Sequence, residues 1–503
     1  MTEISGSSEA AERHQAGTVA FLASPSTHGG QAVTAVETHI SRLFLTPDRV
    51  FKLKRAVALP FLDYSTVASR EQACRAEFAI NRCVAPTLYI GVRPISRSPA
   101  GLAFGTDGEI VDWVVEMRRF AERDQFDLLV ADGRLTDALV DTLADTVAAA
   151  HVGADRVTRH DGSARFASIE HDLIDTTRPL LRSRINLADL AAWRRWMNGM
   201  LERFAPLLDA RGRHGFVRTC HGDLHLANIC LWDGKPVPFD AIEFDPELTE
   251  IDIMYDLAFL LMDLEHAGAG DAANRLLNRY LSVTRDYRGA ALLPMFKSCR
   301  AVVKALVAAM KGIPATSYLD LARAYGDRTE TPRLIAVGGR SGTGKSTVAA
   351  ALAVPIHAVV ISSDMVRKRL FGVPPEQPLP ESAYARDVSE RVYRRLGIDV
   401  RRALAGGSTV IADATFLESA ERDAIARVAE RCGTAFTGLW LEAPTDIRAG
   451  RVAARGPNPS DATISVVQAQ VHTDTGSVGW VRVDAKRNRA DLIQIVRERT
   501  GIS

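Results

Sequence analysis

The sequence predicts a protein of mixed α/β and α+β structure with two folded domains, and three observations predict it. The chain has 503 residues, which is too long for a single hydrophobic core. Residues 38–117 read as strands with one helix, and residues 128–210 read as almost entirely helical. From residue 334 onward, short apolar strands alternate with helices, which is typical of a parallel sheet flanked by helices.

The composition is that of an ordinary globular protein, with 47% hydrophobic and 24% charged residues. A net charge of +1 gives no support for a general nucleic-acid binder or a membrane-surface binder. The six cysteines include no C-x-x-C pair, so they favour reduced thiols over a disulfide framework or a zinc site. We therefore expect a cytoplasmic protein.

No segment predicts a membrane anchor. Residues 1–16 are polar, lack an apolar signal core and predict a disordered tail. The most apolar later segment, residues 251–264, is interrupted by Asp252, Asp256 and Asp263 and is not expected to span a bilayer.

A glycine-rich loop follows the apolar run 334–338 and precedes the expected helix 348–353. Its residues are Gly339, Arg340, Ser341, Gly342, Thr343, Gly344, Lys345, Ser346 and Thr347. Strand, G-x-x-x-x-G-K-S and helix form the P-loop pattern, in which backbone N–H groups surround a phosphate at a helix N-terminus. We predict that all nine residues bind nucleotide, with Lys345 at the β- and γ-phosphates and the Ser346 hydroxyl on Mg²⁺. ATP and Mg²⁺ are thus the expected cofactors.

Two acids follow predicted strands of this domain, where ligands bind in such sheets. Asp364 comes after the strand 357–361, and Asp413 lies at the end of the strand 409–415, at a Walker-B-like position suited to Mg²⁺. A helix N-cap is the alternative role for Asp364. Lys368 and Arg369 are expected on a solvated helix face.

With these motifs, the C-terminal part resembles the small P-loop kinases: polynucleotide kinase, chloramphenicol phosphotransferase, gluconate kinase and the zeta-toxin group. The resemblance implies that Asp364 is the base for the acceptor hydroxyl and that Arg367 grips the acceptor. Residues 456–462 suit a lid, and Arg451 and Arg455 before it would neutralise charge on the transferred phosphoryl group. An ordinary basic helix face is the alternative for these two arginines.

A second chemical segment, His221-Gly222-Asp223, has Asn228 five residues after the acid, Asp240 on the next strand and a D-L-A segment at 256–258. It resembles the catalytic and metal-binding segments of the aminoglycoside phosphotransferase and choline kinase families, which share the protein-kinase fold. The resemblance implies that Asp223 accepts the proton of a substrate hydroxyl and that Asn228 and Asp240 hold Mg²⁺. It also implies a structural role for Asp256.

The same resemblance implies a strand lysine on the phosphates that is paired with a helix glutamate. Lys52 and Lys54 share one face of the strand 50–54, and the sequence leaves the choice between them open. Glu77, in the helix 68–85, is the expected partner. Glu116 and Met117, at the end of the strand 113–117, complete the nucleotide-binding candidates. No G-x-G-x-x-G precedes the lysines, and residues 37–41 stand in its place.

Together the resemblances cover nearly the whole chain beyond the tail. They indicate a bacterial two-module family that joins an aminoglycoside phosphotransferase-like domain to a P-loop kinase-like domain. We expect the first domain at 17–328, with an N-lobe at 17–116 and a C-lobe at 117–328, and the second at 329–503.

The predicted function is ATP/Mg²⁺-dependent phosphoryl transfer to a hydroxyl of a small molecule, with the P-loop domain the surer ATP site. The first alternative makes the N-terminal domain a non-catalytic substrate-binding or regulatory module coupled to ATP binding and hydrolysis by the P-loop domain. A nucleic-acid 5′-hydroxyl kinase is the further alternative, which the absence of an aromatic ladder disfavours. The acceptor's identity and the oligomeric state are left open by the sequence.

Overall fold

A computed structural model describes residues 15–38, 40–59, 62–159, 161–181, 187–243, 245–327, 331–456, 458–486, 491, 493–495 and 498. The chain divides into two compact units, one of Met1–Ala267 with Cys299–Ala322 and one of Gly268–Ser298 with Arg323–Ser503. None of the described helices is long and apolar enough to cross a membrane.

The predicted tail, residues 1–16, lies outside the described residues as far as residue 14. Gln15, by contrast, is buried in a helical stretch, and its side-chain amide donates to the Lys54 carbonyl at 2.8 Å and to Asp112 at 2.9 Å. The prediction of a disordered tail is therefore wrong for its last two residues.

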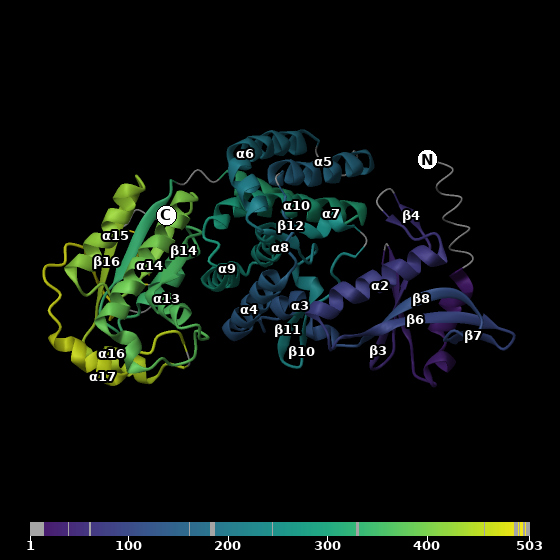
Figure 1. The fold of residues 1–503 in the computed structure, drawn as a ribbon, viewed down its shortest axis with the longest axis horizontal. Coiled ribbons are helices and arrows are strands. Elements are labelled where there is room, and N and C mark those ends of the chain that lie inside the picture. The colour runs from purple at the N-terminus through teal and green to yellow at the C-terminus, as the bar shows by residue number, and fades with distance from the viewer. Residues whose placement is uncertain are drawn as a thin grey trace. The chain divides into compact units, whose positions relative to one another are not determined.

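The first unit contains a six-stranded antiparallel sheet in the order β1-β2-β3-β8-β6-β7 (Figure 1). Its strands are β1 (Thr34–Glu37), β2 (Ser41–Leu45), β3 (Arg49–Lys54), β6 (Tyr89–Ser98), β7 (Gly101–Phe104) and β8 (Glu109–Arg118). Lys52 pairs with Val115 in the β3–β8 register, so β8 fixes the position of the candidate lysine strand. A short hairpin of β4 (Ala58–Leu59) and β5 (Leu62–Asp63) follows β3.

Helix α2 (Val67–Val84) packs against β8, β6 and β3 and carries Glu77 on its buried side. Thr66 begins it as a capping box, because its hydroxyl accepts from the N–H of Ser69 while the Ser69 side chain accepts from the N–H of Thr66. The helix ends ahead of Pro86, whose ring disfavours a helical residue before it. The predicted helix 68–85 is thus present.

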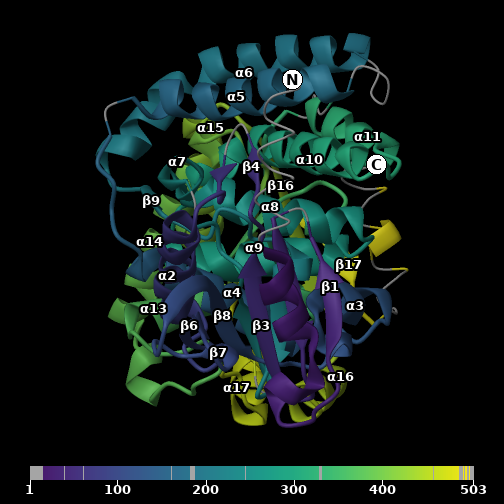
Figure 2. The same ribbon diagram turned by 90° about the vertical axis from the view of Figure 1, so that its right-hand side faces the viewer.

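The remainder of the first unit is mainly helical. Its helices are α3 (Phe126–Ala131), α4 (Asp137–Gly153), α5 (Gly162–Leu181), α6 (Leu187–Arg213), α7 (Pro246–Thr249) and α8 (Ile253–His266). Helices α5 and α6 run side by side (Figure 2). Short strand pairs, β9 (Val217–Thr219) with β12 (Glu250–Asp252) and β10 (Ile229–Trp232) with β11 (Lys235–Pro238), frame the H-G-D segment.

The second unit is a parallel five-stranded sheet in the order β14-β15-β13-β16-β17 with helices between the strands. The strands are β13 (Arg333–Gly338), β14 (Val359–Ser362), β15 (Val410–Asp413), β16 (Ala435–Glu442) and β17 (Val481–Asp484). The connecting helices are α12 (Lys345–Ala353), α13 (Ser363–Leu370), α14 (Arg386–Ala405), α15 (Ser419–Arg431), α16 (Thr445–Ala453) and α17 (Ile464–Ala469). Residues 334–337 of β13 are fully buried, as their apolar run predicts.

Helix α9 (Gly270–Thr284) belongs to the second unit, although it precedes the boundary expected near residue 328. It packs on β14, the edge strand of the sheet. Asn278 accepts the N–H of Val360 through its Oδ1 at 2.6 Å, and Asn274 donates to the carbonyl of Ala358 at 3.2 Å. Two side-chain amides thus satisfy backbone groups that a sheet edge would leave unpaired. Helices α10 (Leu293–Met310) and α11 (Thr316–Gly326) follow, and the compact division falls within each of them.

We predict that Asn278→Ala destabilises the second unit by about 1–2 kcal/mol, because the Val360 N–H loses its partner. Hydrogen exchange of the β14 and β15 amides in urea measures this loss. Asn198→Ala, at an exposed position of α6, is the matched control and should change stability by less than about 0.5 kcal/mol. Equal stability of the two variants would contradict a supporting role for α9.

Candidate active sites

The P-loop connects β13 to α12 in the predicted order, and its glycines are required by the backbone. Gly339, Gly342 and Gly344 have φ of 137°, 82° and 89°. A Cβ at Gly339 would lie 2.4 Å from the Leu441 carbonyl oxygen, and one at Gly342 would lie 2.6 Å from that of Arg448. Glycine is the residue that combines positive φ with so close an approach.

Ser346 and Asp413 meet at the carboxyl ends of β13 and β15. The Ser346 hydroxyl donates to Asp413 Oδ2 at 2.7 Å, and Asp413 is buried. Burial raises the pKa of Asp413 to about 6, although the nearby Lys345 opposes the rise. A hydroxyl and a carboxylate are hard oxygen donors that fit Mg²⁺, so the two predicted metal residues are brought together.

Lys345 and Asp364 flank this pair. The Lys345 ammonium donates to the Arg340 carbonyl at 3.2 Å, and burial lowers its pKa while Asp413 and Asp364 partly offset that effect. Asp364 follows the end of β14, and burial raises its pKa. Ser362 caps α13 by accepting the Asp364 N–H at 3.2 Å, so the alternative that Asp364 itself is the N-cap is wrong.

Arg367 lies one turn beyond Asp364 and is largely buried. Its guanidinium donates to the Ala383 carbonyl at 2.5 Å and to the Ser389 hydroxyl at 3.3 Å, and it stacks on Tyr384. The structure therefore places Arg367 near Asp364 but ties part of its guanidinium to Ala383, ahead of α14, and to Ser389, within α14.

Lys368 and Arg369 do not form the solvated face that the sequence predicts. Lys368 is 1% exposed and pairs with Asp461 at 2.6 Å. Arg369 pairs with Asp399, which is fully buried. Asp461 also accepts from the Tyr384 hydroxyl at 2.6 Å and from the N–H of Leu379, so it ties the predicted lid to the proline-rich loop 374–380.

The two lid arginines differ in their surroundings. Arg451 donates to the carbonyls of Thr343 at 3.3 Å and Ala485 at 2.7 Å, which fixes it beside the P-loop. Arg455 is exposed and donates to the Ala462 carbonyl at 3.1 Å, within the predicted lid.

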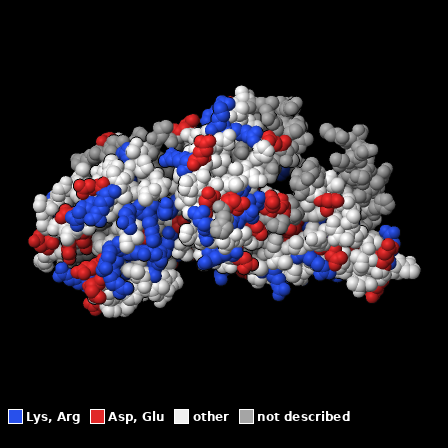
Figure 3. Space-filling view, turned by 45° about the horizontal axis from the view of Figure 1, so that its top comes forward, with Lys and Arg blue, Asp and Glu red and all other residues white. Residues whose placement is uncertain are grey.

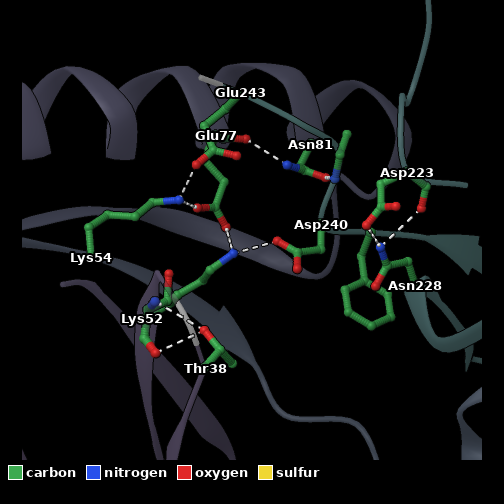
Figure 4. A network of polar contacts seen from close by, with 12 residues as sticks. Thr38, Lys52, Lys54, Glu77, Asn81, Asp223, Asn228, Asp240 and Glu243 are labelled. Carbon is green, nitrogen blue, oxygen red and sulfur yellow. Dashed lines mark hydrogen bonds and ion pairs between the residues drawn. The ribbon is translucent and has the colours of Figure 1, made fainter. Parts of the chain in front are cut away.

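In the first unit, Lys52 lies between Glu77 and Asp240 (Figure 4). Its ammonium is 2.9 Å from Glu77 Oε1 and also pairs with Asp240, whose side chain is 42% exposed. Asp240 has a φ of 61°, an uncommon conformation for a residue other than glycine that its N–H bond to the Tyr89 hydroxyl helps to hold.

Lys54 lies on the same face of the strand, and its ammonium meets Glu77 and Glu243 (Figure 4). It is fully buried, 2.5 Å from Glu77 Oε2 and paired with Glu243, which also accepts from the Tyr64 hydroxyl. Burial alone would raise the pKa of Glu77, but the two lysines lower it to about 2. The geometry favours Lys52 over Lys54 as the lysine that can reach a nucleotide beside Asp240.

The catalytic-loop candidates Asp223 and Asn228 contact one another. The Asn228 amide donates to Asp223 Oδ2 at 2.9 Å and to the Asp223 carbonyl at 3.0 Å. Burial alone would raise the pKa of Asp223, but the neighbouring His225 and His221 outweigh it and hold that pKa well below its usual range. An ionised Asp223 can accept a hydrogen bond from a substrate hydroxyl.

Asp256 braces this loop from α8. It accepts the backbone N–H groups of Gly222 at 2.9 Å and His221 at 3.2 Å, and it pairs with the buried His151 at 3.1 Å. His221 in turn contacts the Phe239 carbonyl at 2.9 Å. The structural role expected for Asp256 is what the structure shows.

Glu116 and Met117 lie at the end of β8. Met117 is buried in the cluster around Val115, on the Lys52 side of the sheet, whereas Glu116 pairs with Arg93 at 3.4 Å. Where protein kinases have a glycine-rich loop, Thr38 closes a turn by donating its N–H and hydroxyl to the Ser41 carbonyl at 2.8 and 2.9 Å.

Comparison with known proteins assigns both units. Residues 53–293 match the phosphotransferase enzyme family, and residues 334–473 match an AAA domain family. The uncharacterized protein Rv2004c of Mycobacterium tuberculosis is 32% identical over 460 residues, covering 88% of this chain and 90% of the relative. The uncharacterized protein Mb2027c of Mycobacterium bovis matches to the same extent.

The chain belongs to this bacterial two-domain family, which joins an aminoglycoside phosphotransferase/choline kinase-like domain to a P-loop kinase domain. The predicted fold class is likewise confirmed. The matched families indicate a phosphotransferase with kinase-like domains and an ATP-binding P-loop.

Two solved structures show a weak likeness to parts of the chain. A gluconokinase from Sinorhizobium meliloti is 24% identical and covers 33% of this chain and 89% of its own, with a TM-score of 0.25. A choline/ethanolamine kinase family protein from Mesorhizobium loti is 14% identical and covers 63% of this chain and 96% of its own, with a TM-score of 0.37.

Gln470 is a residue of this two-domain protein that motif reasoning missed. Its Oε1 accepts the Ser341 N–H of the P-loop at 2.7 Å, and its Nε2 donates to the Ser341 hydroxyl at 3.1 Å. Arg340 reinforces the contact by donating to the carbonyls of Gln470 at 2.8 Å and Thr473 at 3.0 Å. Because Gln470 lies 129 residues from Ser341 in the sequence, no local sequence pattern predicts this contact.

We predict that Lys54→Met costs about 3–5 kcal/mol of stability, because Glu77 and Glu243 are left buried without their shared cation. Lys52→Met should cost less than half as much, since Asp240 is partly hydrated and Glu77 keeps Lys54. Hydrogen exchange of β3 and α2 in urea measures both. A larger loss in Lys52→Met would contradict the assignment of Lys54 as the structural lysine.

We predict that Gln470→Ala weakens Mg²⁺·ATP binding by the P-loop about three- to tenfold, because the loop loses two hydrogen bonds that hold it in shape. Calorimetric titration with a non-hydrolysable ATP analogue measures the affinity. Gln468→Ala, at an exposed position of α17, is the control and should bind as the wild type does. Tighter binding by Gln470→Ala would mean that Gln470 obstructs the loop instead.

Proposed function

We propose that the protein is an ATP/Mg²⁺-dependent kinase that transfers the γ-phosphoryl group to a hydroxyl of a small molecule, with the P-loop domain as its principal catalyst. The observation that carries this proposal is the 2.7 Å contact of Ser346 with Asp413 beside Lys345 and Asp364. A hydroxyl–carboxylate pair, a cation and a second acid at the strand ends are the parts that phosphoryl transfer requires.

When bound, Mg²⁺·ATP supplies the phosphoryl group and screens its charge. Lys345 offers its ammonium to the phosphate oxygens, and the P-loop N–H groups orient them. Asp364 accepts the proton of the acceptor hydroxyl, a task helped by a pKa that burial has raised. Arg455, directly before the predicted lid, neutralises charge as the loop closes.

The kinase-like domain supports a second site of the same chemistry. Lys52, Glu77 and Asp240 form one contact group, and Asp223 with Asn228 forms another. Lys52 would bind phosphate, Asn228 and Asp240 would hold Mg²⁺ through oxygen atoms, and Asp223 would orient the acceptor hydroxyl.

Two observations favour the alternative that this domain is a regulatory or substrate-binding module. The Thr38–Ser41 turn replaces the flexible glycine-rich loop, and Lys52 already neutralises the metal-binding candidate Asp240. Under this alternative, ATP turnover belongs to the P-loop domain alone.

The acceptor is proposed to be a small molecule. Figure 3 shows Lys and Arg side chains gathered on the P-loop unit, and exposed arginines line α14. Such a surface suits an anionic acceptor. A nucleic-acid 5′-hydroxyl remains the further alternative, and an oligonucleotide therefore belongs in the acceptor panel.

The test is ATP turnover with Mg²⁺ against a panel of hydroxyl acceptors, using wild type, Lys345→Ala, Asp364→Asn and Asp223→Ala. We predict that Lys345→Ala lowers P-loop turnover at least about a hundredfold. Asp364→Asn should lower kcat about 10²- to 10⁴-fold with a smaller change in KM. Lys486→Ala, an exposed lysine of the same unit, is the control.

The outcomes separate the alternatives. If Lys345→Ala abolishes all turnover and Asp223→Ala changes nothing, the kinase-like domain is a regulatory module. If each variant removes the phosphorylation of a different acceptor, both domains are catalysts. Phosphate release without a phosphorylated product from any acceptor would contradict the proposal that the protein is a kinase.

A further inference from the structure

A polar cavity of about 230 Å³ lies beside the P-loop. Its lining includes Arg340 and Thr343 of the loop, Trp440 and Glu442 of β16, and Thr445 and Arg448 of α16. Lys345, Ser346, Asp364 and Asp413 do not line it. The cavity therefore adjoins the site assigned to the phosphates, the metal ion and the acceptor, and it shares only Arg340 and Thr343 with the predicted nucleotide-binding loop.

Arg448 is buried at the cavity without a counter-ion among the described residues. Arg448 is 3% exposed. Its guanidinium donates to the Ser341 carbonyl at 3.4 Å and to the Thr445 hydroxyl at 3.1 Å. Both acceptors are neutral, and Nε has no hydrogen-bond partner in the described part of the chain. Arg448 therefore carries a buried positive charge that only neutral groups contact among the described residues, and an anion in the cavity would balance that charge.

A second guanidinium adds to this charge. Arg340 donates to the carbonyls of Gln470 and Thr473, which are also neutral. Burial lowers the pKa of Arg448, and the charge of Arg340 lowers it further. Two like charges at one cavity repel each other, and an anion between them would turn that repulsion into attraction.

The acid at the cavity does not supply the missing charge. Glu442 pairs with Arg482 at 2.9 Å, and its side chain is 46% exposed. The first turn of α16 adds its own positive end, because Thr445 begins the helix at the cavity wall.

We propose that this cavity binds a small anion that carries a phosphate group, held between the guanidinium groups of Arg340 and Arg448 at the start of α16. Guanidinium forks match phosphate oxygens in a bidentate manner, and a helix N-terminus adds N–H donors. The volume exceeds that of free phosphate and leaves room for a short phosphorylated compound. Because Arg340 belongs to the P-loop, the anion is an effector bound next to the nucleotide site, and its binding does not depend on catalysis.

The experiment uses the full-length protein with a saturating non-hydrolysable ATP analogue and Mg²⁺, which fill the nucleotide sites. Inorganic phosphate, pyrophosphate and glycerol 3-phosphate are then titrated by calorimetry into wild type, Arg448→Gln and Arg448→Lys. Arg431→Gln, at an exposed position of α15, is the matched control.

We predict saturable binding to the wild type and to Arg431→Gln, and binding weakened about tenfold or more in Arg448→Gln. Arg448→Lys keeps the positive charge but lacks the two-pronged guanidinium, so its affinity should lie between those of the wild type and Arg448→Gln. Tightest binding of inorganic phosphate would identify free phosphate as the ligand. Tighter binding of pyrophosphate or glycerol 3-phosphate would identify a phosphorylated compound.

Three results would overturn the proposal: no saturable binding to the wild type, unchanged binding to Arg448→Gln, or loss of phosphate binding when the analogue is added. Thermal melting of each variant shows whether it is folded. If Arg448→Gln does not fold, Arg448→Lys decides, because unchanged affinity in that variant would contradict the bidentate site.

Discussion

Buried charge has to be matched, and this constraint organises both domains. An unpaired ion inside a protein costs several kcal/mol, so each cation recruits a carboxylate or a carbonyl. In the kinase-like domain, Glu77 serves Lys52 and Lys54 together, and Asp240 and Glu243 complete the balance. In the P-loop domain, Lys345 lies among Asp364, Asp413 and the Arg340 carbonyl.

The same constraint distinguishes the charged residues that hold the fold together from those that a ligand could reach. Lys54 and Glu243 are sealed from solvent, so their charges satisfy one another and hold β3 to the segment after Asp240. Lys52 and Asp240 share an ion pair at a partly exposed position. There a phosphate can replace Asp240 as the partner of Lys52, and a metal ion can replace Lys52 as the partner of Asp240. Exposure, rather than sequence spacing, distinguishes the two lysines.

Much of the fold and many of the contacting pairs could be predicted from the sequence, because they depend on local patterns. The loop at Gly339–Ser346 needs positive φ at its glycines, and a buried parallel strand needs the apolar run of β13. Ser346 and Asp413 could be paired because parallel strands end at one sheet edge. Their chemical roles stay predictions until turnover is measured.

What could not be predicted depends on contacts between residues distant in sequence. Lys368 reads as a surface lysine by its helix position, yet Asp461, from the predicted lid, draws it into the interior. Gln470, directly after the end of α17, contacts the P-loop across a sequence separation of 129 residues. Gln15 belongs to a polar stretch, and its burial follows from bonds to β3 and β8 that the tail's composition does not reveal.

The domain boundary follows the same rule, with a consequence for how the protein can be divided. Helix α8, whose Asp256 braces the segment 221–223, ends at His266, and α9 begins at Gly270 after a turn at Gly268 with a φ of 77°. Asn274 and Asn278 of α9 then complete the edge strand of the P-loop sheet. A cut near residue 328 would therefore remove the helix that satisfies β14 and expose an unpaired sheet edge, which is a site for aggregation. The match to the phosphotransferase family ends at residue 293 and the match to the AAA domain family begins at residue 334, but the P-loop unit takes its supporting helix from within the segment that matches the phosphotransferase family.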